Sequence, residues 1–217
     1  MEVGYRTEIG HVRKRNEDAL LVQHESGVYA VADGMGGHPA GDVASAVAIA
    51  RLEEVFRGYD GSDPAAAVGG ALEEAHAAVL AAAEEEAARH GMGSTAVVAL
   101  VTSREAWVGH VGDSRCYLFT NGAELRPVTE DHGAGGYLTQ ALGLERGIRP
   151  DVARVPLAAG DRLLLCTDGL TNMVDDTKIA EILGEAEGAQ AACEALTAAA
   201  LDAGGVDNVT SIVIDCH

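Results

Sequence analysis

Short apolar runs separated by polar turns recur along the chain, and they predict β-strands. Residues 19–23 and 28–32 are two such runs, and the Glu-Ser-Gly turn between them has the composition of a hairpin connection. Three later runs follow one another closely and end on Asn121-Gly122, a strong hairpin signal. Consecutive strands with short connections pair antiparallel. The predicted strands are 19–23, 28–32, 95–101, 106–111, 115–119, 163–166 and 209–214.

Between these runs, apolar positions follow the period of an α-helix. Residues 40–56 place valine, isoleucine and leucine side chains at mostly helical spacing. The Ala-rich segment 64–90 has Pro64 near its start and Gly91 just past its end, as helices prefer. Two more helices are predicted at 177–183 and 189–203. Because strands come in runs and helices in separate runs, the pattern indicates an α+β protein and not an alternating parallel α/β sheet.

Length and composition predict one domain with a sizeable core. Of the 217 residues 47% are apolar, and no Pro/Ser-rich linker divides them. Fifteen basic and 34 acidic residues give a net charge of −19, which opposes binding to nucleic acid or to an anionic membrane. The four cysteines form no Cys-x-x-Cys pair and are expected to be reduced core residues. Residues 1–6 lack the apolar core of a signal peptide, and no apolar stretch has the length of a membrane span, so we expect a cytoplasmic protein.

Acidic turns carry the strongest indication of chemistry. Asp33 directly follows the apolar run 28–32, and Asp168 follows another, so each would emerge at the end of a buried strand. Asp113 and Asp207 lie in similar short turns. One such turn is ordinary, but several clustered carboxylates would be costly unless divalent cations neutralised them. Carboxylate oxygens suit Mg²⁺ or Mn²⁺ better than zinc.

Two other kinds of site are not supported. The Gly-rich segment 33–41 follows a predicted strand and opens a predicted helix, as a phosphate-binding loop does. It lacks the Gly-Lys-Ser/Thr of a P-loop, and Pro39 stands where the dinucleotide fingerprint requires Gly or Ala. The eight histidines include no His-Glu-x-x-His pair, so a zincin-like site is not indicated.

Eight short motifs, in order, resemble the bacterial branch of the metal-dependent type 2C protein serine/threonine phosphatases. No motif is sufficient alone, but together they extend from about Gly4 to Ile214. They are Arg-x-x-Asn-Glu-Asp (13–18), Asp-Gly-Met-Gly-Gly-His (33–38), Gly-Ser-Thr-Ala (93–96), Gly-Asp-Ser-Arg (112–115), Thr-Glu-Asp-His (129–132), Gln-Ala-Leu-Gly (140–143), Thr-Asp-Gly-Leu (167–170) and Asp-Asn-Val-Thr (207–210).

The resemblance implies a four-layer αββα sandwich of two antiparallel sheets with a binuclear Mn²⁺ or Mg²⁺ centre at one end. Asp33 matches the ligand that bridges both metals, and the Gly34 carbonyl would complete one of them. Asp168 and Asp207 match ligands of the second metal. Asp113 matches the position that, with Asp168, holds a third and weaker ion.

Three further residues have counterparts in this family. Arg13 matches the arginine that binds the phosphate, although without the resemblance a solvated basic turn would be the better interpretation. Glu17 and Asp18 match groups that hold metal-bound waters. The implied reaction is hydrolysis of phosphoserine and phosphothreonine by direct attack of a hydroxide that bridges the two metals, so no side chain becomes phosphorylated.

Two departures from the family pattern affect these expectations. Only eight residues, 133–140, stand where relatives usually carry a longer flap beside the active site, which puts substrate selection by the flap in question. Met35 occupies the place where many eukaryotic members have a histidine proposed as general acid, and methionine cannot donate a proton.

The expected partners are phosphorylated proteins, among them a serine/threonine kinase and its substrates, and we expect a monomer that binds neither nucleic acid nor membrane. Metal-dependent hydrolysis of phosphodiesters or nucleotides would use the same carboxylates, but the chain lacks the basic stripe of a nucleic-acid enzyme. A catalytically silent metal-binding regulator would be expected to have lost a ligand, and none is missing.

Overall fold

The strands form two five-stranded sheets and one small two-stranded sheet, in which all neighbours are antiparallel. The computed structural model describes residues 1–35, 40–121, 124–134 and 137–217. The strands are β1 (Glu2–Glu8), β2 (Asp18–Gln23), β3 (Val28–Asp33), β4 (Ala96–Val101), β5 (Glu105–Val111), β6 (Arg115–Phe119), β7 (Leu125–Pro127), β8 (Gly133–Ala134), β9 (Tyr137–Leu138), β10 (Asp151–Pro156), β11 (Arg162–Cys166) and β12 (Val209–Asp215). One large sheet has the order β1-β12-β11-β6-β7, the other β10-β5-β4-β3-β2, and β8 pairs with β9.

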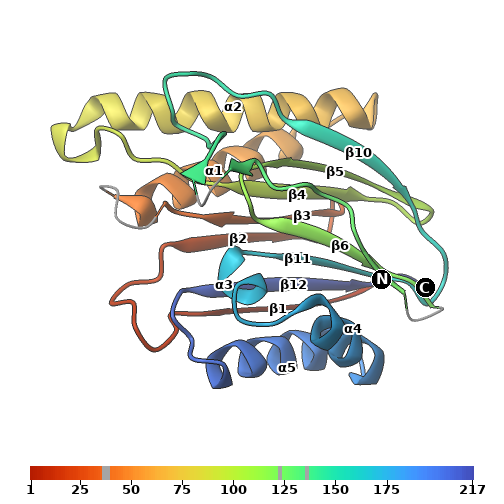
Figure 1. The fold of residues 1–217 in the computed structure, drawn as a ribbon. Helices are drawn as coiled ribbons and strands as arrows, with labels where there is room; N and C mark the ends of the chain where they lie inside the picture. The colour runs from red at the N-terminus through yellow and green to blue at the C-terminus, as the bar shows by residue number, and fades with distance from the viewer. Residues whose placement is uncertain (36–39, 122–123, 135–136) are drawn as a thin grey trace.

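Helices cover the outer face of each large sheet. They are α1 (Gly41–Arg57), α2 (Pro64–Glu85), the 3₁₀ turn η1 (Ala87–Arg89), α3 (Asp168–Thr171), α4 (Asp176–Glu185) and α5 (Ala189–Asp202). Helices α1 and α2 pack on the sheet that contains β3, and α5 packs on the sheet that contains β12 (Figure 1). The predicted α+β class and four-layer αββα sandwich are therefore confirmed.

The alternation of side chains along a strand explains why the strands are apolar without interruption. In β3, Val28, Ala30 and Ala32 face the helices, while Tyr29 and Val31 face the other sheet. Successive side chains of a strand point to opposite faces, and here both faces are covered. The molecule thus has three buried layers, one between the sheets and one under each set of helices.

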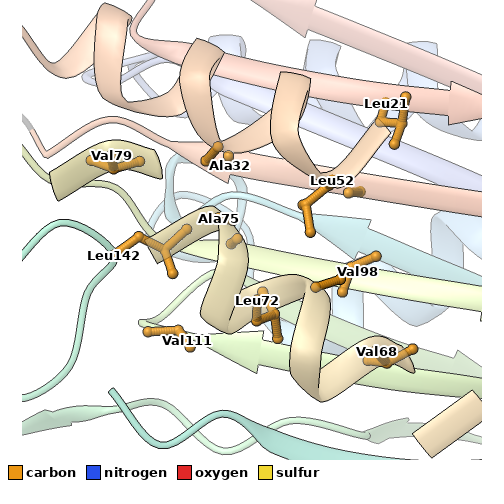
Figure 2. Close-up of a cluster of buried hydrophobic side chains, with 14 of the residues drawn as sticks. Leu21, Ala32, Leu52, Val68, Leu72, Ala75, Val79, Val98, Val111 and Leu142 are labelled. Carbon is orange, nitrogen blue, oxygen red and sulfur yellow. The ribbon is translucent and has the colours of Figure 1, made fainter. Parts of the chain in front are cut away.

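The layer under α1 and α2 also reaches the segment that leads to the acidic cluster. Figure 2 shows Leu52 of α1 and Leu72 of α2 within this layer, together with Val98 of β4. Val79 of α2 and Leu142 belong to the same layer and are fully buried. The C-terminal half of α2 is thereby fixed against the segment that follows β9.

Some predicted elements differ from the structure. The predicted helix 64–90 ends earlier, because Glu86 is extended (φ −139°) and a separate 3₁₀ turn follows. Strands β1 and β10 were not predicted, since each lies at a sheet edge and buries only one residue fully. Their exposed faces leave too few apolar positions to produce the strand pattern.

Three segments named in the sequence analysis fall outside the described residues. They are 36–39 in the Gly-rich segment, Gly122 in the predicted hairpin, and 135–136 in the shortened flap. All four cysteines are free and buried, as expected. Among the helices described, none is long and apolar enough to cross a membrane.

Candidate metal centre

The four aspartates predicted as metal ligands and Arg13 line one cavity of about 880 Å³, while Gly34 is not among its lining residues. Asp33 ends β3, and Asp113 lies in the turn between β5 and β6. Asp168 is the first residue of α3, directly after β11, and Asp207 precedes β12. Carboxylates from strand ends of both large sheets thus converge on one cavity.

Hydrogen bonds fix the backbone of Asp33. The Asp33 amide donates to Oγ1 of Thr95 (3.1 Å), and its carbonyl accepts from Oγ of Ser94 (2.9 Å) and from the Thr95 amide (2.8 Å). The Thr95 hydroxyl also lies 2.7 Å from the hydroxyl of Ser114, next to Asp113. One threonine therefore connects the end of β3 with the turn that carries Asp113.

Two glycines allow the backbone segments around the cluster to approach closely. A Cβ on Gly169 would overlap the carbonyl oxygen of Asn208, so α3 could not begin beside the Asp207 turn with a larger residue at this position. A Cβ on Gly34 would likewise overlap the carbonyl of Gly41, at the start of α1. Both glycines are needed for space, and neither has a positive φ.

Asn208 holds the N-terminal loop against the cluster. Its Nδ2 donates to the carbonyl oxygens of Ile9 and Arg15, both at 2.9 Å, and its Oδ1 accepts from the Glu17 amide at 2.8 Å. The Glu17 carbonyl in turn accepts from the amide of Gly34 at 3.0 Å. The sequence analysis gave Asn208 no role, although its motif, Asp-Asn-Val-Thr, was noted.

Asp18 lies beneath the cluster, and one of its carboxylate oxygens is fully occupied. Oδ2 accepts from the hydroxyls of Thr210 (2.6 Å) and Thr167 (2.9 Å). Oδ1 is buried and has no hydrogen-bond partner within the described residues. Asp168 shows the same asymmetry, because its Oδ2 accepts from Nδ2 of Asn172 (3.0 Å) while Oδ1 lacks a partner in this part of the chain.

Burial and mutual repulsion make the charged state of these carboxylates unfavourable. Burial raises the pKa of Asp33 well above its usual value, and the charges of Asp18 and Asp168 raise it further. Burial also raises the pKa of Asp18 to about 7 and that of Asp113 to about 6, and it raises the pKa of Asp168. Divalent cations would offset this repulsion. Unpartnered buried oxygens in a set of hard carboxylate ligands therefore fit Mn²⁺ or Mg²⁺.

Arg13 contacts the cluster directly. Its Nη2 donates to Oδ2 of Asp207 at 2.6 Å, and this bond is the largest cause of a raised Arg13 pKa. The side chain of Arg13 is 36% exposed. The interpretation of Arg13 as a solvated turn residue is therefore not supported, because its guanidinium is paired with a carboxylate of the cluster.

The Thr-Glu-Asp-His motif holds the turn that carries Asp113. Asp131 accepts two hydrogen bonds from the guanidinium of Arg115 (2.8 and 2.7 Å). Arg115 therefore pairs with Asp131 and not with Asp113 of its own turn. Nδ1 of His132 accepts from the Gly112 amide at 3.2 Å, and the His132 amide donates to the Gly112 carbonyl at 2.8 Å.

His110, His132 and Asp151 are close enough together to be considered as a separate metal site. However, Nε2 of His110 lies 2.8 Å from the Glu130 carbonyl, and His132 uses its nitrogens on Gly112 and Asp151. The two imidazole rings are stacked, with centroids 4.4 Å apart and planes at 21°. Lone pairs in nearly parallel planes do not point at one ion, so we interpret this group as part of the support for the Asp113 turn.

Comparison with known proteins identifies the family. The sequence profile of the protein phosphatase 2C family matches residues 9–203. The chain belongs to the protein phosphatase 2C family. Its relatives include the serine/threonine phosphatase stp of Listeria monocytogenes serovar 1/2a, which is 33% identical over 99% of this chain and 96% of its own length.

Solved structures agree with this protein phosphatase 2C assignment. The Mycobacterium tuberculosis serine/threonine phosphatase PstP/Ppp superposes with a TM-score of 0.89 at 33% identity, and the match covers 100% of both chains. A structure of the PstP catalytic domain in complex with two manganese ions has a TM-score of 0.88 at 35% identity, covering 98% of this chain and 96% of that one. The chain is thus a protein serine/threonine phosphatase of a metal-dependent family, and the resemblance predicted from the motifs is confirmed.

Proposed function

We propose that this protein phosphatase 2C member removes phosphate from phosphoserine and phosphothreonine of proteins with two Mn²⁺ or Mg²⁺ ions held by the acidic cluster. The observation that supports it most is the convergence of four aspartates and Arg13 on one cavity. In this proposal Asp33 would hold both ions, and the Gly34 carbonyl would help to hold one of them. Asp168 and Asp207 would hold the second ion.

Two bound ions would supply a hydroxide at neutral pH, by lowering the pKa of a shared water, and would neutralise charge on the phosphate. The chain's own residues orient and balance this site. Asp18, fixed by Thr167 and Thr210, keeps one carboxylate oxygen available for a metal-bound water. The carboxylate of Glu17 would take the same kind of role on the side of α1.

Arg13 would bind two phosphate oxygens when substrate enters. Its guanidinium lies within the cavity and is already directed at the cluster through Asp207. With Asp207 holding a metal ion, the guanidinium would be available to a dianionic phosphate, whose charge it would balance as that charge shifts in the transition state. Met35 also lines the cavity but has no proton to donate, and in this proposal water would protonate the leaving oxygen in its place.

Asp113 would hold a third and weaker ion together with Asp168. It lines the same cavity, and its turn is supported by Thr95, Arg115 and His132 through the contacts described above. We further propose that the substrates are phosphoproteins of a serine/threonine kinase, with the kinase itself among them, and that residues 1–217 act as one monomeric catalytic domain.

The test is a comparison of substrates in the presence and absence of Mn²⁺. Phosphate release from a phosphothreonine peptide is measured beside hydrolysis of a cyclic nucleotide and of an aryl phosphodiester. We expect manganese-dependent turnover of the phosphopeptide, and loss of this turnover with a chelator. Faster hydrolysis of either diester would contradict the proposal and favour a phosphodiesterase. Metal binding without turnover of any of the three would favour a silent regulator.

A further inference from the structure

The cavity that contains the acidic cluster extends well beyond it. Its volume, about 880 Å³, lies near the upper end of the range for pockets that enclose a drug-sized ligand, whereas a phosphate group is far smaller. The far part is lined by α2, by the end of the shortened flap at Tyr137 and Leu138, and by residues 143–146 that follow the flap. The segment leading to β10 crosses over the yellow C-terminal part of α2 (Figure 1).

This far part is mainly apolar. Leu80 and Ala83 lie one turn apart on α2 and form one wall, while Tyr137, Leu138 and Leu144, from the segment between β8 and β10, form a second wall. Tyr137 is 82% exposed, whereas Leu80 and Leu144 are half-buried. An apolar side chain that entered between these walls would cover leucine surface that water now contacts.

The walls are positioned by contacts within the protein. The Gly143 amide donates to Nδ1 of His76 on α2 at 3.1 Å, which holds the segment after Leu142 against the helix. Nη2 of Arg146 donates to the Leu138 carbonyl at 2.9 Å and so connects the two ends of the second wall. The cleft is therefore a built feature and continues without interruption into the metal centre.

Two glutamates, one arginine and one histidine give the rim its polar character. Glu84, His90, Glu145 and Arg146 line the cleft and are exposed, and Arg146 already donates to a backbone carbonyl, which leaves the two glutamates as the rim's free carboxylates within the described residues. The whole chain carries a net charge of −19. A flanking peptide rich in acidic or additional phosphorylated residues would be repelled here, while neutral or basic residues would be accepted.

We propose that this cleft binds the polypeptide next to the phosphorylated residue, with an apolar side chain between Leu80 and Leu144 and with neutral or basic residues at the rim. The proposal rests on the proposed phosphatase function and names the class of phosphoprotein that the site prefers. The cleft and the metal centre form one continuous cavity, so the chain that flanks a phosphate bound at the metal centre would lie in this cleft. The walls, one of which includes Tyr137 and Leu138 of the shortened flap itself, thus provide the substrate selection that the short flap put in question.

The test uses the full chain with Mn²⁺ and phosphothreonine peptides that differ at single positions. Peptides with leucine at either neighbouring position are compared with a glycine-flanked parent. We expect kcat/KM to be roughly tenfold higher for the better of the leucine peptides, the order expected for placing an aliphatic group in an apolar pocket. Replacing acidic residues farther along the peptide with lysine should raise kcat/KM by about twofold to fivefold at low ionic strength.

Variants then locate the effect. Leu80→Gln on the first wall and Leu144→Gln on the second should each bring the ratio of kcat/KM for the leucine peptide to kcat/KM for the glycine peptide close to one. The matched control Ala81→Gln, at an exposed position of α2, should leave this ratio unchanged. Thermal unfolding of each variant shows whether it folds. If one wall variant does not fold, the other still decides the question.

Three outcomes are distinguishable. Wild-type protein that hydrolyses neither peptides nor p-nitrophenyl phosphate overturns the proposed function and this inference with it. Equal kcat/KM for leucine and glycine peptides, with manganese-dependent turnover of both, overturns the cleft proposal alone. A leucine preference that survives in both wall variants also overturns it, since another surface must then bind the side chain.

Discussion

Asp33 is the residue on which the proposed centre depends most, because its carboxylate would contact both ions. Asp33→Asn should lower Mn²⁺ affinity strongly and reduce kcat by a thousandfold or more, roughly the loss seen when a group essential to the reacting centre is removed. The fold should persist, since Thr95 and Ser94 bind the backbone of residue 33 and not its side chain. Calorimetric titration with Mn²⁺ and a phosphatase assay measure the two effects. Asp202→Asn, an exposed change at the end of α5, is the control.

Arg13 offers a second prediction at the same scale. Arg13→Ala should raise KM for phosphopeptides and lower kcat/KM by about tenfold to a hundredfold, because a charge-assisted bidentate contact to the phosphate is lost. Manganese stoichiometry should not change. Lys14→Ala, in the same turn but outside the cavity, is the matched control. Wild-type kcat/KM in the Arg13 variant would return this residue to the role of a surface turn.

Asp113 separates the third ion from the central pair. Asp113→Ala should retain two tightly bound Mn²⁺ ions yet lose most turnover, because Asp33, Asp168 and Asp207 do not depend on its side chain. Metal content after gel filtration and a crystal grown in Mn²⁺ measure occupancy. An empty central pair in this variant would falsify the assignment of Asp113 to the third site alone.

Among the structural elements, the junction between α3 and β12 is the most constrained. Gly169→Ala should force α3 away from the Asn208 carbonyl and separate Asp168 from Asp207. We expect a loss of about 1–3 kcal/mol in the free energy of unfolding, the usual cost of overpacking, together with weaker Mn²⁺ binding. A Cβ added to Gly70, within α2, would meet no atom within 4 Å. Gly70→Ala should therefore raise the free energy of unfolding by about 0.5–1 kcal/mol. Chemical denaturation measures both, and equal behaviour of the two variants would contradict the packing argument.

How well an element can be predicted depends on how much of it is buried. Strands such as β4, with all residues buried, give uninterrupted apolar runs, and their positions were predicted within one residue. Edge strands β1 and β10 expose most side chains and left no usable pattern. The end of α2 was placed too late because residues 86–90 remain rich in helix-forming side chains, while the chain becomes extended at Glu86.

The residues of the site likewise divide into those that the sequence pattern reveals and those whose contacts depend on the packing. Aspartates at the ends of apolar runs could be found in the sequence, since several such carboxylates together would be costly without cations, although one alone is ordinary. The contacts of Asn208 and of the Thr-Glu-Asp-His motif could not, because they join segments up to 199 residues apart and depend on the final packing. Likewise, nothing in the sequence pattern indicated that Arg13 would pair with Asp207.

For the whole molecule, the raised pKa values predict how stability depends on pH. Asp113 and Asp18 have pKa values of about 6 and 7 in the folded protein, against a usual 3.8. The folded state therefore binds more protons than the unfolded state between these values, so stability in a chelator should fall as pH rises from about 4 to 7. Added Mn²⁺ should reverse the fall, since it favours the ionised carboxylates.

Thermal melts in EDTA and in MnCl₂ at several pH values check this dependence. The double variant Asp18→Asn with Asp113→Asn should flatten the curve measured in EDTA, because two of the raised groups no longer titrate. A wild-type protein in EDTA whose melting temperature rises steadily from pH 4 to 7 would contradict the prediction. The exposed change Asp202→Asn should leave the slope as it is.

The proposed ligands come from both large sheets, Asp33 from one and Asp168 and Asp207 from the other. Between the sheets lies an apolar layer, and all four cysteines are free, so no disulfide joins the two halves. Bound ions would therefore link the two sheets at one end of the sandwich. Amide hydrogens near the end of β3 and near the start of β12 should both exchange more slowly when manganese is present. It follows that manganese supply would set how long the enzyme survives proteolysis as well as how fast it turns over.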